Sequence, residues 1–315
     1  MVCHNCEHLA KKHGKDRKGN QRYRCNTCQK TFIEAQEKPL DNMYLPLEKA
    51  VMILSMLLEG SSVRSVQRIT GVEKKTILKL LVLAGEKCER LLNDKIKGVA
   101  IKDVQADELW GFIAMKNKTK HRNKVDDEQL GSCWTFVAME THTKLVLAWH
   151  LGRRTTSDTV EFTEKLNEAT TGRFQLTTDA FAGYADAVCY SLGTRVDYAQ
   201  MVKIYKNDEV KRTEKRYSPT EFIKAIQTPI WGRPEKERIC TSHIERQNLT
   251  IRMSLRRLTR LTNAFSKKWQ NLKSALALYF AYYNFVRTHQ TLRCTPAMAS
   301  GITKSFWTLE DLLNY

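Results

Sequence analysis

The sequence predicts an α/β protein in which a mixed sheet flanked by helices follows two smaller segments. Two Cys-x-x-Cys pairs lie within the first 28 residues, and helical apolar periodicity runs from about residue 45 to 96. Beyond residue 97, apolar β-branched stretches alternate with amphipathic ones. We therefore expect a cysteine-anchored module at 1–38, a linker at 39–46, a helical domain at 47–96 and an α/β domain at 97–315.

The chain is strongly basic, with a formal net charge of +18 spread along its 315 residues. This predicts nucleic acid as the partner. A basic membrane helix is the alternative, but no segment sets Trp, Phe and Leu opposite Lys and Arg. Without an apolar signal region or a run of about 18 apolar residues, we expect a cytoplasmic, nucleoid-associated protein with no membrane partner.

The first segment carries four of the nine cysteines, and they are spaced to bind a metal. Four thiolates can surround one Zn²⁺ as a tetrahedron, and the stretch between the two pairs is long enough for a hairpin. YRCNTCQKTF resembles the second knuckle of a zinc ribbon. Such a small segment has little core, so zinc would hold it together. Whether the ribbon contacts DNA or only scaffolds stays open. The predicted ligands are Cys3, Cys6, Cys25 and Cys28.

The segment 47–96 has the pattern of a helix-turn-helix. A first helix is expected to end at Gly60, and a short helix with Val66 and Ile69 inward is broken at Gly71. The next helix is expected to bury Ile77, Leu80 and Leu81. An ordinary helical hairpin is the alternative. In a helix-turn-helix, the residues that face the major groove would be Lys74, Lys75, Thr76 and Lys79.

The sequence of the third segment predicts strands with an acid in the middle of one strand and at the end of another. Residues 99–113 read as a buried central strand with Asp107 in its middle, and a buried carboxylate is costly unless paired or bound to metal. A hairpin, a helix beginning near Ser157 or Asp158, a strand ending at Asp179 and a helix follow. Residues 197–205 are expected to form an edge strand or the final strand of the sheet. This order is that of an RNase H-like core with a mixed five-stranded sheet, in which Asp107 and Asp179 lie side by side.

The stretch SHIERQNLTIRMSLRRLTR supplies one acid, Glu245, at the head of a basic segment. If 243–261 is helical, Glu245 borders a buried stripe made by Ile244, Ile251, Leu255 and Leu258. Glu245 would then join Asp107 and Asp179 in holding Mg²⁺ or Mn²⁺. A surface glutamate paired with Arg246 or Arg252 is the alternative. The arginines expected to follow a DNA backbone are Arg246, Arg252, Arg256, Arg257 and Arg260.

Two neighbours of these acids receive lesser roles. Glu108 is expected to point to the opposite side of the strand from Asp107, which makes it a secondary candidate. His243 is expected to satisfy a local hydrogen bond in preference to carrying protons.

Four stretches, ADELWGF, TTDAFAGY, SHIERQNLTIRMSLRRLTRLTNAFSKK and YYNFVRTHQTLRCTPAMASGI, together resemble the insertion-sequence-one type transposases of the DDE superfamily. The resemblance covers nearly the whole chain. It implies that Asp107, Asp179 and Glu245 form a metal-binding triad, that the N-terminal modules recognise terminal inverted repeats, and that the protein oligomerises on DNA. The 66 positions between Asp179 and Glu245 exceed the usual spacing, so 205–239 is expected to be an insertion, and Glu235 and Glu237 remain outside candidates.

The expected function is therefore metal-dependent cleavage of double-stranded transposon-end DNA and its transfer to target DNA. Two other functions remain open at this point. One is a non-catalytic zinc-ribbon and helix-turn-helix regulator. The other is an RNase H-like nuclease or resolvase that cuts without joining.

Overall fold

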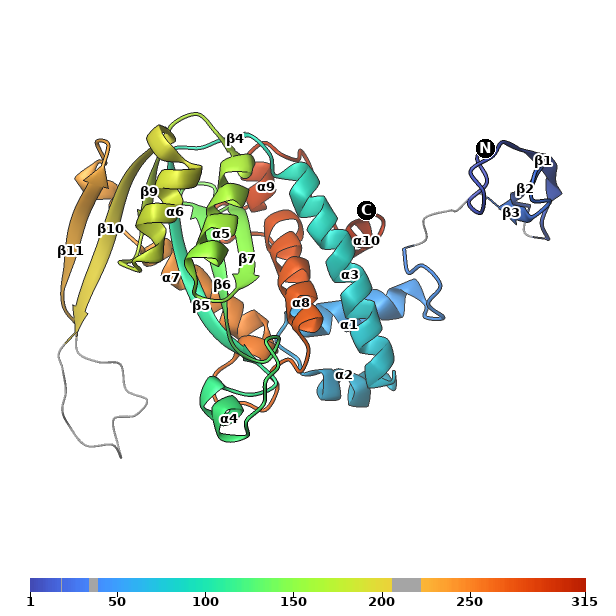
Figure 1. Cartoon of the computed structure of the whole chain (residues 1–315), viewed down its shortest axis with the longest axis horizontal. Helices are drawn as coiled ribbons and strands as arrows, with labels where there is room; N and C mark the ends of the chain where they lie inside the picture. The colour runs from blue at the N-terminus through green and yellow to red at the C-terminus, as the bar shows by residue number, and fades with distance from the viewer. Residues whose placement is uncertain (18, 34–38, 206–221) are drawn as a thin grey trace. The chain divides into compact units, whose positions relative to one another are not determined.

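The computed structural model describes residues 1–17, 19–33, 39–205 and 222–315 (Figure 1). Two compact units are present, Met1–Met43 and Tyr44–Leu313. The first unit contains a three-stranded antiparallel sheet of β1 Ala10–Lys15, β2 Gln21–Cys25 and β3 Thr31–Ile33. Among its described residues, those buried are Cys3, Cys25 and Leu40, so two of the three are metal-ligand candidates.

Three helices open the second unit, as the apolar periodicity predicts. They are α1 Leu47–Leu58, α2 Val63–Thr70 and α3 Lys74–Lys95. The Ser62 hydroxyl caps α2 by accepting from the N–H of Ser65 at 3.0 Å, and Gly71 ends it with a left-handed φ of 69°. Val66 is fully buried, but Ile69 is 67% exposed, so the prediction that Ile69 faces inward is wrong.

The helical segment packs directly on the α/β part through α3 and α8, Trp269–Ala281. At their closest approach, a Cβ on Gly85 would lie 2.4 Å from the Cβ of Ser274, so only glycine fits there. Lys273 and Glu89 form an ion pair of 2.8 Å between the same helices. We expected a boundary near residue 96; instead, residues 44–313 form one compact unit because this contact joins the two parts.

The α/β part is built on a mixed sheet of six strands, in the order β11-β10-β9-β5-β6-β7. The strands are β5 Asp103–Ile113, β6 Gly131–Glu140, β7 Val146–Gly152, β9 Phe174–Thr178, β10 Val196–Tyr205 and β11 Phe222–Trp231. β5 lies parallel to β9 and antiparallel to β6. Short strands β4 Val99–Ala100 and β8 Thr170–Thr171 pair separately.

The sheet therefore has six strands, and the prediction of five is wrong. β11 pairs antiparallel with β10, so β10 is not the edge strand that its sequence predicted. β11 belongs to the segment 205–239 that was expected to be an insertion. Residues 206–221 of that segment lie outside the described residues.

Helices cover both faces of the sheet (Figure 1). On one face lie α5 Thr156–Ala169 and α6 Gly183–Ser191, and on the other lies α7 Ser242–Ser254. The remaining helices are α4 Asn117–Arg122, α9 Pro296–Ala299 and α10 Leu309–Leu313, of which α10 packs on α1 and α3. Short 3₁₀ turns span Gly193–Arg195, Lys236–Arg238 and Arg256–Leu258, and a π-helical turn spans Tyr282–Val286. Thr155 caps α5 by accepting from the N–H of Asp158. Among the described residues, no helix has both the length and the apolar character needed to cross a bilayer.

The helix predicted over 243–261 is shorter than expected. α7 ends at Ser254, and Leu255 is extended before the 3₁₀ turn. Arg252 donates to the carbonyl of Leu258 at 2.8 Å, and the Thr259 hydroxyl donates to the carbonyl of Arg252 at 2.9 Å. These local bonds compensate for the helical bonds that are lost. The four residues of the predicted apolar stripe are nevertheless all buried: Ile244, Ile251, Leu255 and Leu258.

Candidate metal centres and nucleic-acid interface

The four N-terminal cysteines form a compact group. One Sγ atom from each lies within 4.8 Å of the others, with 3.6 Å between Cys3 and Cys28 and 3.4 Å between Cys6 and Cys25. Sulfur atoms around one tetrahedral zinc ion lie about 3.8 Å apart, because each zinc–sulfur bond is about 2.3 Å. The backbone N–H of Cys28 donates to Cys25 Sγ and lowers the pKa of this thiol to about 6, against the opposing effect of burial. The predicted grouping is confirmed, and the cysteines are close enough to bind one metal ion.

A second group consists of acids on neighbouring strands of the sheet. One carboxylate oxygen each from Asp107, Glu108 and Asp179 lies within 4.8 Å of the other two. The strand register explains the pairing, because Gln105 of β5 lies opposite Thr177 of β9 and both acids come two residues later. The prediction that Asp107 and Asp179 lie side by side is confirmed.

The environment of Asp107 disfavours its negative charge. Burial, and then the charges of Glu108, Asp179 and Glu245, raise the pKa of Asp107 to about 7. Its oxygens accept hydrogen bonds from the N–H of Glu108 and from Asn248 Nδ2, each at 2.8 Å. In the described part of the chain, no lysine or arginine forms an ion pair with it. A divalent cation would supply the missing positive charge, so the donor set fits a hard metal ion.

Glu108 points to the opposite face of β5 from Asp107, as its strand position predicts. Its carboxylate points toward α6, where the Tyr184 hydroxyl donates to Oε2 at 3.1 Å, while Asn248 of α7 contacts Asp107 on the other face. Pairing of β5 with β9 stops at Gln105, so no described strand separates the two carboxylates along that edge. The expected direction of Glu108 is confirmed, but one of its oxygens still lies within 4.8 Å of Asp107 and Asp179, so Glu108 belongs to the acid group.

Arg154 is the cation that contacts this group, and the sequence analysis did not identify it. It pairs with Glu108 Oε1 at 2.5 Å and lies 3.8 Å from Asp179 Oδ2. Its guanidinium also lies over the rings of Trp134, at 4.8 Å, and Phe181, at 4.2 Å. These contacts fix a positive charge at one side of the acids.

Glu245 lies near the acid group but is not part of it. Its Oε1 accepts from the Thr241 hydroxyl at 2.6 Å and pairs with Lys203, and the carboxylate is 44% exposed. The expected alternative partners, Arg246 and Arg252, are not its partners. Two of the three predicted ligands are thus together, while Glu245 is turned to a neighbouring lysine.

Asn248 takes the place next to Asp107 that the sequence assigned to Glu245. It lies three residues after Glu245 on the same side of α7, a spacing that would have revealed it. Its Oδ1 is buried without a hydrogen-bond partner among the described residues. The outside candidates Glu235 and Glu237 are not in the acid group, and Glu235 pairs with Arg238 at 3.3 Å.

The residues predicted to enter a major groove lie at the start of α3. Lys74, Lys75 and Lys79 are exposed, and Thr76 is half-buried. Glu73 caps the helix by accepting from the N–H of Lys75. The lysines are therefore free of the core and available to an anionic partner.

The predicted DNA-facing arginines divide into two groups. Arg246, Arg256 and Arg260 are exposed. Arg252 instead donates to the carbonyl of Trp110 at 3.0 Å, and Arg257 donates to the Ser266 hydroxyl at 3.1 Å.

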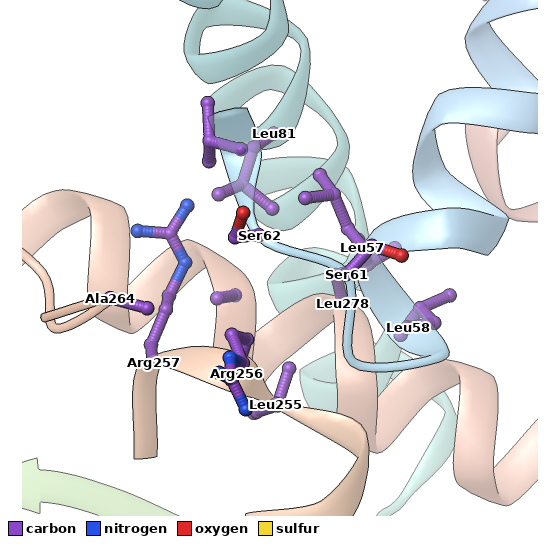
Figure 2. Close-up of a pocket in the computed structure, with 12 residues that line it drawn as sticks. Leu57, Leu58, Ser61, Ser62, Leu81, Leu255, Arg256, Arg257, Ala264 and Leu278 are labelled. Atoms are coloured by element: carbon purple, nitrogen blue, oxygen red, sulfur yellow. The ribbon is translucent and has the colours of Figure 1, made fainter. Parts of the chain in front are cut away.

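Burial lowers the pKa of both Arg252 and Arg257 to about 10. Figure 2 shows Arg257 extending toward Ser62 in a pocket that is also lined by Leu57 and Leu81. These two arginines bind protein groups, contrary to the prediction that they face DNA.

Arg246 lines a cavity of about 390 Å³ that contains several cationic side chains. Lys144, His243, Arg287 and His289 share it, and no acid is among the described residues that line it. Burial and then Lys144 lower the pKa of both His243 and His289. His289 Nδ1 is buried without a hydrogen-bond partner in the described part of the chain. Such a cavity suits an anionic group.

The second unit thus places a carboxylate centre and exposed cationic residues around one helix, α7. No model of a known protein family matches this sequence, and no curated protein sequence matches it. The chemistry available at the centre is that of carboxylate oxygens and one fixed guanidinium, an arrangement suited to hard divalent cations.

Proposed function

We propose that this chain is a DNA transposase that cleaves transposon-end DNA and transfers the cut strand to target DNA. The observation that carries the proposal is the acid group of Asp107, Glu108 and Asp179 at the centre of the sheet in a chain of net charge +18. The order of strands and helices supports an RNase H-like core, and the sequence resembles the insertion-sequence-one type transposases. Mg²⁺ or Mn²⁺ is the proposed metal because all the ligands are oxygens.

Asp107 and Asp179 are the proposed central metal ligands, with Glu245 as the third. Both oxygens of Glu108 are held in a buried network with Arg154 and Tyr184, which is costly to dismantle. The pair between Glu245 and Lys203 is partly exposed, and such pairs contribute about 1 kcal/mol or less. Glu245 can therefore leave Lys203 for a cation at little cost.

When bound, a pair of divalent cations would activate the attacking oxygen and stabilise the leaving oxygen of an in-line displacement. The protein groups around them orient the substrate. Asn248 fixes the Asp107 carboxylate by a hydrogen bond, and Arg154 holds a positive charge where a substrate phosphate would lie. The exposed Arg246, Arg256 and Arg260 attract the DNA backbone.

The N-terminal modules are proposed to find the DNA ends. Zn²⁺ at the four cysteines would hold the first unit together, and the exposed lysines at the start of α3 would contact double-stranded inverted repeats. Because two transposon ends must be held at once, we propose that the protein acts as a homo-oligomer on DNA.

One assay tests the proposal. The purified full-length chain is incubated with labelled DNA from the flanks of its coding region, a target plasmid and Mg²⁺. Strand-transfer products support the transposase. Nicks without joining indicate the nuclease or resolvase, and binding without products indicates the regulator. Asp107→Ala is expected to abolish cutting while DNA binding stays within several-fold of the wild type; equal loss of both would show that Asp107 is structural.

A further inference from the structure

A groove of about 680 Å³ lies at the end of β5, beginning two residues after Glu108. Its lining includes Trp110 and Phe112 from β5, Lys116 before α4, and Arg260 and Phe265 from the segment after α7. Its volume is in the range of pockets that bind small organic ligands. Of these five residues, only Arg260 has a role in the proposed function.

The groove and the acid group both contain residues of β5. β9 pairs with β5 only as far as Gln105, so the second half of β5 has a side without a described neighbouring strand. Glu108 and Trp110 are two residues apart on β5 and therefore on the same face, about 7 Å apart at the usual rise of a strand. Nucleotides next to a phosphate at the acid group are therefore within reach of the groove.

Aromatic rings form one wall. Ring centroids lie 5.7 Å apart for Trp110 and Phe112 and 4.7 Å apart for Phe112 and Phe265, with interplanar angles of 37° and 42°. All three side chains are half-buried, so part of each ring is accessible from the groove. Nucleobases stack on such rings whatever their sequence, because every base has a π-face.

Cations accompany the rings. Lys116 Nζ lies 5.7 Å from the Trp110 centroid and 5.9 Å from the Phe112 centroid, and Lys267 Nζ lies 3.9 Å from the Phe265 centroid. No aspartate or glutamate is among the described residues that line the groove. The occupant that matches aromatic walls and unpaired positive charge is aromatic and anionic at once, which describes a nucleotide and excludes an apolar peptide or an acyl chain.

We infer that this groove binds an unstacked base of the DNA strand next to the phosphate held at the acid group, a role that rests on the proposed function. The base lies against Trp110 and Phe265, and its phosphates lie near Lys116 and Arg260. Trp110 and Phe265 are thus positioning residues that hold an unpaired end of the strand.

The test compares three DNA molecules by fluorescence anisotropy, without divalent cations, on the full-length chain. They are a flush duplex, the same duplex with a short single-stranded extension, and the same extension made abasic so that only its phosphates remain. We expect the extension with bases to bind at least about fivefold more tightly than the abasic one, since each stacked base contributes about 1–3 kcal/mol. Equal affinity for these two would overturn the inference, and this comparison needs no variant.

Substitutions test whether the preference for bases depends on the aromatic residues of the groove. Trp110→Ala is expected to lose the preference for bases while its affinity for the flush duplex is unchanged, and Trp110→Phe is expected to keep most of the preference. Phe306→Ala, at another exposed aromatic residue (53% exposed), is the control and should behave as the wild type. A preference for bases that survives in both Trp110→Ala and Phe265→Ala would place the base elsewhere and overturn the assignment.

The outcome separates this inference from the transposase proposal. Cutting and joining in Mg²⁺ without a preference for bases would refute the groove and leave the transposase standing. A preference for bases lost in Trp110→Ala, without any cutting, would support the groove and refute the transposase.

Discussion

Asp107→Asn should stabilise the protein in the absence of divalent cations, although it removes a proposed metal ligand. The raised pKa of Asp107, about 7, means that its ionised form is disfavoured in the fold. Relative to the ordinary aspartate value of 3.8, this corresponds to a cost of about 4 kcal/mol once the pH is above 7. An asparagine carries no charge and avoids this cost.

The hydrogen bonds of the site tolerate the change. The amide oxygen of the new side chain can accept from the N–H of Glu108, as the carboxylate does. Its NH₂ group can donate to Asn248 Oδ1, which is buried without a partner among the described residues, if the Asn248 amide rotates by a half-turn. The gain in stability should therefore approach the electrostatic cost.

The difference in stability between Asp107→Asn and the wild type should depend on pH. A carboxyl group whose pKa is raised by folding destabilises the fold increasingly as pH rises from the unfolded value toward the folded one. The variant should exceed the wild type by up to about 4 kcal/mol at about pH 8, and by less than about 2 kcal/mol at about pH 5. The difference should vanish below about pH 4.

Urea denaturation of both proteins at these pH values, without added divalent cations, measures the effect. Asp126→Asn is the matched control, because Asp126 is exposed and its substitution should change stability by about 0.5 kcal/mol or less. Added Mn²⁺ should then stabilise the wild type and leave Asp107→Asn unchanged. A variant no more stable than the wild type at about pH 8, or a gain that does not depend on pH, would show that the charge of Asp107 is already compensated.

Three further predictions concern the other parts of the chain. Glu245→Gln should abolish cutting with little change in the free energy of unfolding, whereas Arg154→Ala should lower it by about 3 kcal/mol because the buried Glu108 carboxylate loses its cation; cutting that persists in Glu245→Gln would make Glu108 the third metal ligand. Cys28→Ser should reduce zinc content and unfold the first unit, measured by metal analysis and NMR, and an unchanged spectrum would show that metal does not hold this unit. Gly85→Ala should destabilise the second unit by about 1–3 kcal/mol despite alanine's better helix propensity, because its Cβ would lie 2.4 Å from Ser274 Cβ; Ser274→Gly should restore part of the loss, and a neutral effect in thermal unfolding would argue against close packing of α3 on α8.

The sequence correctly predicted features that depend on interactions between residues close together in the chain. The paired cysteines, the glycine at position 71 and the apolar spacing of α1, α2 and α3 depend on nearby residues, and these elements are present. The apolar stripe of α7 was also predicted, although the helix ends early, because Leu255 and Leu258 are buried in either conformation.

Long-range pairing explains what the sequence did not predict. β10 looked like an edge strand because nothing within it shows that β11 pairs beside it. Arg252 and Arg257 looked like DNA ligands because their acceptors, the carbonyl of Trp110 and the hydroxyl of Ser266, are identified only by the fold. An arginine in a basic run has the same sequence signal whether it binds phosphate or a backbone carbonyl.

The position of Glu245 depends on how α7 is attached to the sheet. Gln105, fully buried on β5, accepts from the N–H groups of His243 and Ile244 at 2.9 and 3.2 Å. The first turn of α7 is thus tied to the strand that carries Asp107, two residues away. Helical spacing then places both Glu245 and Asn248 toward that aspartate, and the shorter side chain makes the direct contact. Glu245 is near enough for its charge to raise the pKa of Asp107, and its proposed role as a ligand requires its carboxylate to leave Lys203.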